Sequence, residues 1–480
     1  MRPAADHAQN GLSTVVPPHE PSAAGERDVA EILEDFLRRS GVPGVAAGLF
    51  TSEGVVAQAA RGVSSIECPE LPMTPQTVGT ALSLSKVMTA TALGVLAARG
   101  QVDFDAPVSN HLPDVYGRDR FDTTTLRHLL SHTAGLVHGP VPYSAKAKSA
   151  DPLEHYVLGA CLGAARFAEP GQVFGYSNVG ITIAGYVLQK VTGKPFATAM
   201  RETLFAPAGM SRTTVDPLVA MTYPLSQQHV LDGAGELVVR RSFDAAPTSR
   251  PSTGAFSCAR DLARLGVVHL GGTAGDGDRP LLTADVVRDL HTPVVDVGLD
   301  ILRSFGLTLT VGPRYGRFMS VGHEGYYEGG WIKLLLIPEQ RIGVAWMDNR
   351  GEDPALEDDR QRCYDRLLAL LGGGARSWRR DEEICDLDVS SAAGRYVRPA
   401  GRPMDLTAGP YGLRATDGVT TADYDHLTGR VFVARGDATD LPARIPWAPD
   451  KDSTRSAMCV VGPAQAPTHI LMNGLPYQRR

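Results

Sequence analysis

The sequence of 480 residues lacks the cysteine pairs and histidine clusters that build disulfide frameworks or metal sites. It has six cysteines, none of which forms a C-x-x-C pair, and its histidines show no cluster at metal-ligand spacing. Cysteines scattered in this way are usually buried free thiols. We therefore expect neither a disulfide framework nor a metal ion or other cofactor.

Long apolar runs are missing as well. No stretch approaches the roughly 18 to 20 unbroken apolar residues of a membrane span. Residues 1–22 are polar and rich in Pro and Ala, and they contain no apolar run of signal-peptide length. A formal net charge of -6 gives no reason to expect a nucleic acid or an anionic membrane as a partner. These absences lead us to expect a cytoplasmic protein.

The apolar residues that are present form patterns of secondary structure. Helical spacing runs through residues 26–40, and paired apolar runs with short turns predict β-hairpins at residues 45–59 and 331–347. An amphipathic helix is predicted from residue 356, and the long section between the hairpins has mostly helical patterning. We therefore predict an α+β fold: one antiparallel sheet flanked by the terminal helices, with a helical subdomain inserted between its strands.

The chain is predicted to divide into four parts. Residues 1–25 form a disordered N-terminal tail, and residues 26–374 form the large α+β domain. A Gly-rich and then charged stretch indicates a linker over residues 375–388. In residues 389–480, short apolar runs alternate with Gly, Asp and Pro turns, which predicts a small all-β domain.

The candidate nucleophile lies in Ser83-Leu84-Ser85-Lys86, the only Ser-x-x-Lys of a chain that has seven lysines. The motif opens an apolar-periodic helix, and positions three apart lie on one helix face, so the Lys86 ammonium can reach the Ser83 hydroxyl. A serine needs an adjacent base near neutral pH, and a lysine serves when burial or positive charge lowers its pKa. The alternative is a helix start whose serines act only as caps.

Two further motifs accompany this one. Tyr176-x-Asn178 is the only Tyr-x-Asn in the chain, and His323-x-Gly325 stands shortly before the second predicted hairpin. In this order the three motifs resemble the signature of the serine β-lactamase and penicillin-binding-protein superfamily, which is Ser-x-x-Lys, then Tyr-x-Asn, then Lys-Thr-Gly or His-x-Gly.

The resemblance covers residues 26–374, and the all-β domain resembles the lipocalin-like tail of many relatives. Outside the motifs, four segments are similar to recurrent segments of the family: residues 100–108, 126–136, 185–195 and 254–262. Within the superfamily, the chain is similar to the class C-like branch of esterases, D-aminopeptidases, acyltransferases and penicillin-binding-protein-type thioesterases.

The resemblance implies a role for each motif residue. Ser83 is the nucleophile and Lys86 its base. Tyr176 relays the proton to the leaving atom and later activates the acceptor. Asn178 holds Lys86 and a substrate amide, and His323 supports the tyrosine. Because His323 replaces the Lys with which β-lactamases bind a substrate carboxylate, we expect that antibiotic hydrolysis is not the main function.

Other residues are implied beside the substrate. The backbone N–H groups of Ser83 and Tyr326 form the oxyanion hole, and Gly325 lines the substrate site. Glu324 and Glu328 place two carboxylates next to the expected mouth of the cleft. They are either ordinary surface charges or binding groups for the free amine of a substrate, since desolvated carboxylates bind ammonium groups well.

Two other groups of residues are given structural roles. His128, His132 and His138 cluster in sequence, but their spacing follows a structural segment of the family, and we do not assign them to a metal site. Asp103 and Asp105 precede a proline in a turn and are interpreted as caps.

These residues predict a serine hydrolase or acyltransferase that acts through an acyl-Ser83 intermediate on an ester, thioester or peptide. An alternative within this chemistry is a penicillin-binding-protein-type thioesterase, which releases a nonribosomal peptide from a peptidyl carrier protein and closes it into a ring. The alternative from another class is a catalytically inactive binding module on the same fold. The acyl donor, the acceptor, the oligomeric state and the role of the all-β domain stay open.

Overall fold

A computed structural model provides the three-dimensional structure of the chain. It describes residues 23–112, 121–139, 151–241, 246–275, 277–299, 302–327, 329–351, 356–377, 388–397, 403–409, 412–418, 421–428, 431–434, 457–461, 467–472 and 475–480.

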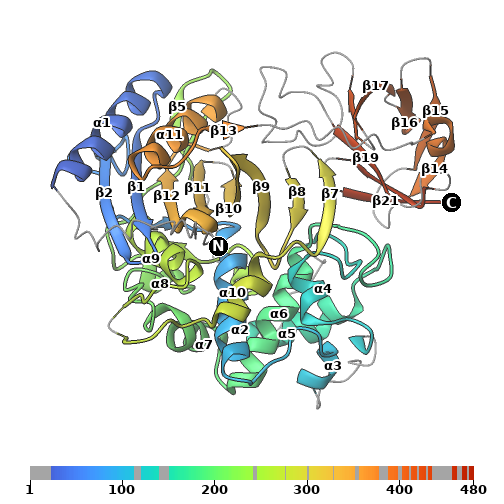
Figure 1. Ribbon diagram of the computed structural model, residues 1–480, viewed down its shortest axis with the longest axis horizontal. Helices are drawn as coiled ribbons and strands as arrows, with labels where there is room; N and C mark the ends of the chain where they lie inside the picture. The colour runs from blue at the N-terminus through green and yellow to red at the C-terminus, as the bar shows by residue number, and fades with distance from the viewer. Residues whose placement is uncertain are drawn as a thin grey trace, which may run out of the picture.

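The large domain is built on one antiparallel sheet, whose strands follow the order β2-β1-β12-β11-β10-β9-β8-β7, with β13 beside β9 (Figure 1). Both predicted hairpins are confirmed as β1–β2 and β11–β12. β1 also pairs with β12, so the first hairpin and the last one lie side by side. The strands are β1 (Gly44–Thr51), β2 (Gly54–Gly62), β7 (Val295–Leu299), β8 (Leu302–Phe305), β9 (Thr310–Tyr315), β10 (Phe318–Tyr327), β11 (Gly330–Ile337), β12 (Ile342–Asp348) and β13 (Arg376–Ser377).

Helices cover both faces of this sheet. The terminal helices α1 and α11 pack on one face, and α9 packs on the other, together with the inserted subdomain below it in Figure 1. The helices are α1 (Ala23–Ser40), α2 (Leu84–Ala98), α3 (Val108–His111), α4 (Leu126–Leu130), α5 (Pro152–Gly159), α6 (Asn178–Thr192), α7 (Phe196–Met200), α8 (Pro217–Ala220), α9 (Ala259–His269), α10 (Ala284–His291) and α11 (Glu357–Leu370).

Short elements complete the inserted subdomain and its borders. Two small sheets pair β3 with β6 and β4 with β5. These elements are β3 (Gly79–Thr80), β4 (His229–Leu231), β5 (Leu237–Val239), β6 (Phe256–Ser257), η2 (Cys161–Gly163), η3 (Arg201–Phe205), η4 (Pro247–Ser249) and η5 (Pro338–Gln340).

The central strands have apolar residues on both sides because both sides are covered. Every residue of β12 is buried, and so is every residue of β1 except its last. The covering helix α9 comes so close that a Cβ on Gly266 would lie 2.1 Å from the Phe50 ring. Strands that are buried on both faces have continuous apolar runs in their sequences, as β1 and β12 do.

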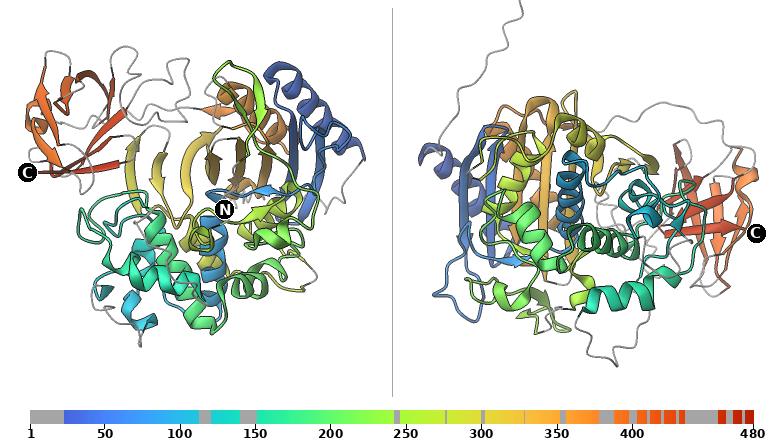
Figure 2. Two further views of the ribbon diagram at one scale, coloured as in Figure 1. Left: turned by 180° about the vertical axis from the view of Figure 1, so that it is seen from behind. Right: turned by 90° about the horizontal axis from the view of Figure 1, so that it is seen from below.

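The C-terminal domain is a closed barrel of eight antiparallel strands, in which β14 pairs with β21 (Figure 2). This topology confirms the predicted all-β, lipocalin-like domain. The barrel contacts the large domain where β19 meets β7. Its elements are η7 (Val389–Ala392), β14 (Gly394–Val397), β15 (Met404–Ala408), β16 (Gly412–Thr416), β17 (Thr421–Thr428), β18 (Val431–Ala434), β19 (Ala457–Val461), β20 (His469–Met472) and β21 (Leu475–Arg479).

Two boundaries of the large domain differ from those expected. Helix α1 begins at Ala23, three residues before the predicted start. Residues 376–377, assigned to the linker from sequence, form β13 and pair with β9. A two-residue strand has no periodicity to detect, so only its distant partner reveals it. Residues 1–22 and 378–387 lie outside the described residues. No helix in the described ranges combines the length and the apolar character needed to cross a membrane.

A buried ion pair joins α11 to the sheet. The Arg360 guanidinium donates to both carboxylate oxygens of Asp348 at 2.9 Å and lies 4.4 Å from the centre of the Trp331 ring. Both charged side chains are almost completely excluded from solvent. Removing one partner would leave the other charge buried without compensation.

We therefore expect Arg360→Met to lower the free energy of unfolding by about 3 to 5 kcal/mol. Most of this loss should be recovered in Arg360→Met/Asp348→Asn. The matched control is Arg366→Met on the same helix, whose ion pair with Asp35 is half-exposed and should contribute about 1 kcal/mol or less. Unfolding in guanidinium chloride, followed by tryptophan fluorescence, measures the free energy of unfolding of the three variants. Equal losses in the two single variants would contradict a special role for the buried pair.

Candidate active site

Ser83 stands at the turn into α2. The preceding Leu82 has φ 48°, a left-handed conformation that is costly for a leucine and is found mainly where the surroundings enforce it. Ser85 holds the turn, since its hydroxyl donates to the Leu82 carbonyl at 2.6 Å and accepts from the Ala255 N–H at 3.0 Å. The half-buried Ser83 side chain is thereby presented at the helix start.

Lys86 follows one helical turn later, as the spacing predicted. Its ammonium nitrogen lies 3.2 Å from Ser83 Oγ and 2.7 Å from the Ser252 carbonyl oxygen, and the side chain is completely buried. Burial lowers the pKa of Lys86 to about 7. A substantial fraction is therefore neutral at neutral pH and able to accept the Ser83 proton.

Tyr176 precedes α6 and completes this group. The Lys86 nitrogen lies 4.9 Å from the centre of the Tyr176 ring. Burial raises the pKa of Tyr176, and the Glu324 carboxylate adds to the rise, while the nearby Ser83 hydroxyl opposes it. Tyr176 thus stays a phenol at neutral pH, which suits a group that passes a proton on rather than a free phenolate base.

His323 lies on β10 beside Tyr176, with 6.2 Å between the ring centres. Its Nδ1 donates to the Glu324 carbonyl at 2.6 Å, and its Nε2 is buried without a hydrogen-bond partner among the described residues. Burial, with the charge of Lys86 adding, lowers the pKa of His323 to about 3. The ring is therefore neutral, with a free acceptor on Nε2.

Two histidines interpreted as purely structural also contact Tyr176. The His132 ring centre lies 4.4 Å from that of Tyr176, and the His138 ring stacks on the Tyr176 ring with 5.7 Å between their centres. His132 Nδ1 accepts from the Ser177 N–H at 3.1 Å, and His138 Nδ1 donates to the Tyr176 carbonyl at 2.9 Å. Burial lowers the pKa of His132 well below its usual range, so that ring is neutral, and the pKa of the more exposed His138 is lowered in the same direction. The closeness of these histidines in the sequence was the signal that could have placed them at the site.

Asn178 begins α6, where Ser177 caps the helix by accepting from the Gly180 N–H at 3.1 Å. The carboxamide oxygen of Asn178 is buried without a hydrogen-bond partner in the described part of the chain. The hydrogen bonds of Lys86 described above go to Ser83 and Ser252, not to Asn178. Sequence reasoning missed Ser252, because nothing local marks a backbone carbonyl that accepts from a residue 166 positions away.

Gly325 lets β10 approach the nucleophile. A Cβ on Gly325 would lie 2.7 Å from Leu82 Cβ and 2.8 Å from the Ser83 nitrogen, so only glycine fits without displacement. The next residue, Tyr326, stacks on Trp331 with 5.4 Å between ring centres. The strand segment named from the third motif thus lies against the Ser83 backbone.

Glu324 occupies the opposite face of β10. Its carboxylate pairs with the Lys333 ammonium at 3.0 Å, and Lys333 lies over the Tyr364 ring of α11. Glu324 therefore lies on the face of β10 away from His323, because adjacent strand residues point to opposite faces. That alternation was the signal that could have placed it. Glu328 lies outside the described residues.

The remaining candidates behave as structural groups. Asp103 accepts from the Asp105 N–H at 2.8 Å, and Asp105 pairs with Arg127. Among the described residues, no group of three or more His, Cys, Asp or Glu side chains is arranged to hold a metal ion.

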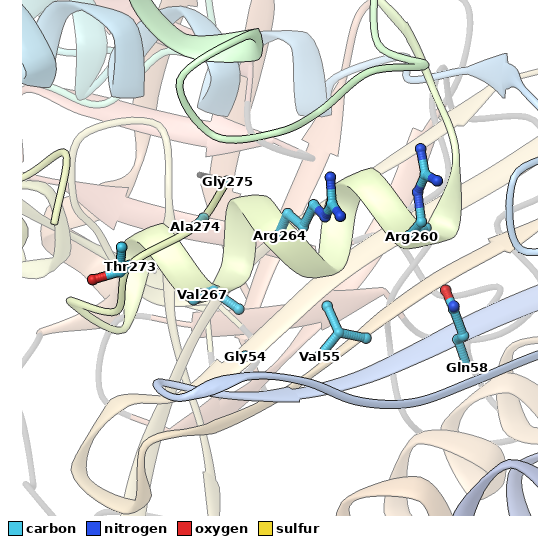
Figure 3. A pocket seen from close by; sticks show the side chains of 9 residues that line it. All are labelled: Gly54, Val55, Gln58, Arg260, Arg264, Val267, Thr273, Ala274 and Gly275. Atoms are coloured by element: carbon cyan, nitrogen blue, oxygen red, sulfur yellow. The ribbon is translucent and has the colours of Figure 1, made fainter. Parts of the chain in front are cut away.

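A cavity of about 290 Å³ lies away from this site, between α9, β2 and the loop that follows α9 (Figure 3). The side chains of Arg260 and Arg264 line it but point away from β2 (Figure 3). Arg260 donates to Ser211, and Arg264 to the Gly209 carbonyl. Because both arginines bind the chain's own loop, we assign no ligand to this cavity.

Comparison with known proteins agrees with this geometry. The family model described as Beta-lactamase matches residues 29–417. The chain is 27% identical to penicillin-binding protein 4 of Amycolatopsis lactamdurans over 370 residues, which are 75% of this chain and 95% of that protein.

Two solved structures share the fold. SurE has a TM-score of 0.76 and 22% identity, covering 95% of this chain and 99% of its own. A D-amino acid amidase of Ochrobactrum anthropi SV3, complexed with D-phenylalanine, has a TM-score of 0.58 and 23% identity, covering 73% of this chain and 99% of its own. The match to SurE therefore extends into the C-terminal barrel.

The pKa of Lys86 sets a testable pH dependence. Because the base must be neutral, kcat/KM for an activated ester should reach a plateau above about pH 7 and fall roughly tenfold per pH unit below it. Steady-state rates between pH 5 and 9 measure this. A flat profile from pH 5 to 8, or a midpoint near the usual lysine pKa, would contradict the assignment of Lys86 as base.

Thermal melts at each pH provide the control for this profile. Burial lowers the pKa of His291 to about 4, below that of an unfolded histidine, so its contribution to stability is lost as the pH falls from about 6.5 towards 4. Only rates measured where the melt is unchanged report on Lys86.

Proposed function

The chain belongs to the Beta-lactamase family, and we propose that, as a serine hydrolase of this family, it transfers an acyl group through an ester on Ser83. The single observation that carries this proposal is the contact of a completely buried lysine with Ser83 Oγ at 3.2 Å, with the Tyr176 ring centre 4.9 Å from the lysine nitrogen. The lysine is buried and its hydrogen bonds go to Ser83 and Ser252 rather than to a carboxylate, which costs free energy of folding. An inactive binding module would gain nothing from such a residue.

In the first step, Ser83 Oγ attacks the acyl carbon. The bond from Oγ to that carbon forms, the Ser83 proton passes to Lys86, and the bond to the leaving atom breaks. Tyr176 donates its proton to the leaving atom and recovers one from Lys86. The backbone N–H groups of Ser83 and Tyr326 receive the developing oxyanion, and donors of this kind often supply the largest electrostatic term.

In the second step, an acceptor attacks the acyl-Ser83 ester. Its proton passes through Tyr176 to Ser83 Oγ as the ester bond breaks, which restores the starting state. Asn178 supports this step and the first as an acceptor for a substrate amide N–H, because its buried carboxamide oxygen has no protein partner among the described residues. His323 keeps a neutral acceptor beside the Tyr176 ring.

For the substrate, we propose a peptidyl acyl donor whose reacting residue has the D configuration. The support is that one structural neighbour is SurE with D-Leu and another is named a D-amino acid amidase, whose structures hold D-phenylalanine and also L-phenylalanine. The second candidate is release and macrocyclisation of a peptide from a carrier protein in the cytoplasm. Acyl transfer from Ser83 to an amine of the peptide itself would use the same residues, with that amine in place of water as the acceptor.

Acyl-enzyme formation tests the core of this proposal. Matched peptidyl thioesters that end in a D- or an L-residue are mixed with the protein, and the Ser83 peptide is examined by mass spectrometry. We expect the acyl mass on Ser83 with the D-ended donor, and none in Ser83→Ala, which should lose activity by several orders of magnitude. A folded Ser83→Ala that keeps more than about 1% of the rate would mean another nucleophile.

The products of the same reactions separate the acceptors. Liquid chromatography with mass detection distinguishes the free acid, which reports hydrolysis, from a cyclic product, which reports attack by the amine of the peptide itself. Cyclic product from a donor with a free N-terminus, but not from its N-acetylated match, would support the second candidate. Free acid from every donor would leave a hydrolase and contradict macrocyclisation.

Benzylpenicillin should be at best a slow substrate. His323 is neutral, because burial lowers its pKa to about 3, and so it offers no positive charge to the penicillin carboxylate. We expect kcat/KM for penicillin about 10- to 150-fold below that for a simple activated ester, since a charged hydrogen bond contributes roughly 1.5 to 3 kcal/mol. Spectrophotometric assays of both substrates measure the ratio, and comparable values would contradict the argument.

A further inference from the structure

A lysine forms an ion pair with the strand that carries the third motif, on the face of the sheet opposite His323. Glu324 and Lys333 are direct neighbours across β10 and β11, and their side chains form an ion pair at 3.0 Å. They lie on the face of the sheet that α11 covers, whereas His323 lies on the face that carries Tyr176. Both charged groups are largely buried, with exposed fractions of 19% for Lys333 and 15% for Glu324.

Glu324 connects this pair to the catalytic face through its backbone. Its carbonyl accepts from His323 Nδ1 at 2.6 Å, which leaves Nε2 as the acceptor facing the site. The next residue, Gly325, packs against the Ser83 nitrogen so closely that no side chain fits. Displacing Glu324 would therefore move both the histidine and the wall of the oxyanion hole.

The surroundings of the pair are rich in titratable groups. Lys333 lies 4.9 Å from the centre of the Tyr364 ring. The charged and titratable groups around the pair come from β9, α11 and β13: Tyr315, Glu357, Tyr364, Asp365 and Arg376. The groups that face His323 on the other side of the sheet are Tyr176, Lys86 and His132.

We propose that Lys333 is a positioning residue of the active site: by pairing with Glu324 behind β10, it fixes the backbone that presents His323 and Gly325, and it neutralises the carboxylate there. The proposal rests on the proposed function, since it assigns Lys333 a role in acyl transfer at Ser83. Lys333 touches neither the nucleophile nor its base. It acts through Glu324.

The charges of the pair reach the catalytic groups. The low pKa of His323 is caused first by burial, and the positive charges of Lys86 and Lys333 contribute to it. The Glu324 carboxylate adds to the burial that raises the pKa of Tyr176. Without Lys333, His323 would lose one of the positive charges that oppose its protonation, and the unpaired Glu324 carboxylate would favour the protonated forms of nearby bases by Coulomb attraction.

Below pH 7, protonation of Glu357 cannot compensate for the negative charge that Glu324 would carry without Lys333. Burial, with Glu324 adding, raises the pKa of Glu357 to about 7. Below pH 7 this group is therefore already largely protonated and has no negative charge left to lose. The acid limb of the rate profile is thus the range in which removal of Lys333 should be most visible.

The experiment compares pH profiles of kcat and KM for an activated ester. Lys333→Met removes the charge at similar length, and Lys333→Arg keeps it. Lys333→Met/Glu324→Gln removes both charges of the pair. The matched control is Lys190→Met, since Lys190 also pairs with a glutamate, at 3.5 Å, and lies over a tyrosine ring, at 5.9 Å, but on α6 and partly exposed.

We expect Lys333→Met to move the acid limb to higher pH by about half a unit or more and to lower kcat more than it raises KM. Lys333→Arg and the double variant should return the limb to within about 0.2 units of the wild type, within which Lys190→Met should also stay. If Lys333→Met does not fold, Lys333→Gln, which keeps a hydrogen-bond donor to Glu324 without the charge, should show the same shift.

Two outcomes are distinguishable. An unchanged acid limb in folded Lys333→Met or Lys333→Gln, or a shift that the double variant retains in full, would overturn the positioning role. Ester hydrolysis that persists in Ser83→Ala would overturn the proposed function itself, whatever Lys333 does.

Discussion

The burial of the Lys86 ammonium is the constraint on which the rest of the site depends. Its nitrogen reaches the Ser83 hydroxyl and the Ser252 carbonyl, and neither carries a charge that would keep the lysine protonated. Burial alone therefore lowers its pKa to about 7 and makes it a base. A carboxylate in the place of the Ser252 carbonyl would hold the proton on Lys86 and end its use as a base.

The groups around Lys86 follow from the same requirement. His132 and His323 are both neutral, because burial and the nearby ammonium both oppose their protonation. Tyr176, enclosed by these rings, remains a phenol. The site is thus a set of neutral hydrogen-bonding groups around one lysine near its pKa, in which a proton can move without opposing a fixed charge. The Glu324–Lys333 pair keeps the back of the strand neutral as well.

Much of the fold could be predicted because its signals are local. The two hairpins of the large sheet, helices α1 and α11 and the barrel all showed their own periodicity or turn residues. The errors concern contacts between distant segments. Residues 376–377 join the sheet at Arg314 and Tyr315, the end of β9 that lies beyond its pairing with β8. The face taken by Glu324 depends on which side of β10 receives α11 and which receives α2.

The sequence by itself determined the contact between Ser83 and Lys86, because helical geometry places residues three apart on one face. It also determined the order of the three motifs, but not their distances. Only the tertiary structure decided that Tyr176 and His323 lie beside Lys86, that Ser252 supplies a carbonyl, and that Glu324 faces away. These positions depend on the packing of elements far apart in the chain, and they set the burial that turns a common lysine into a base.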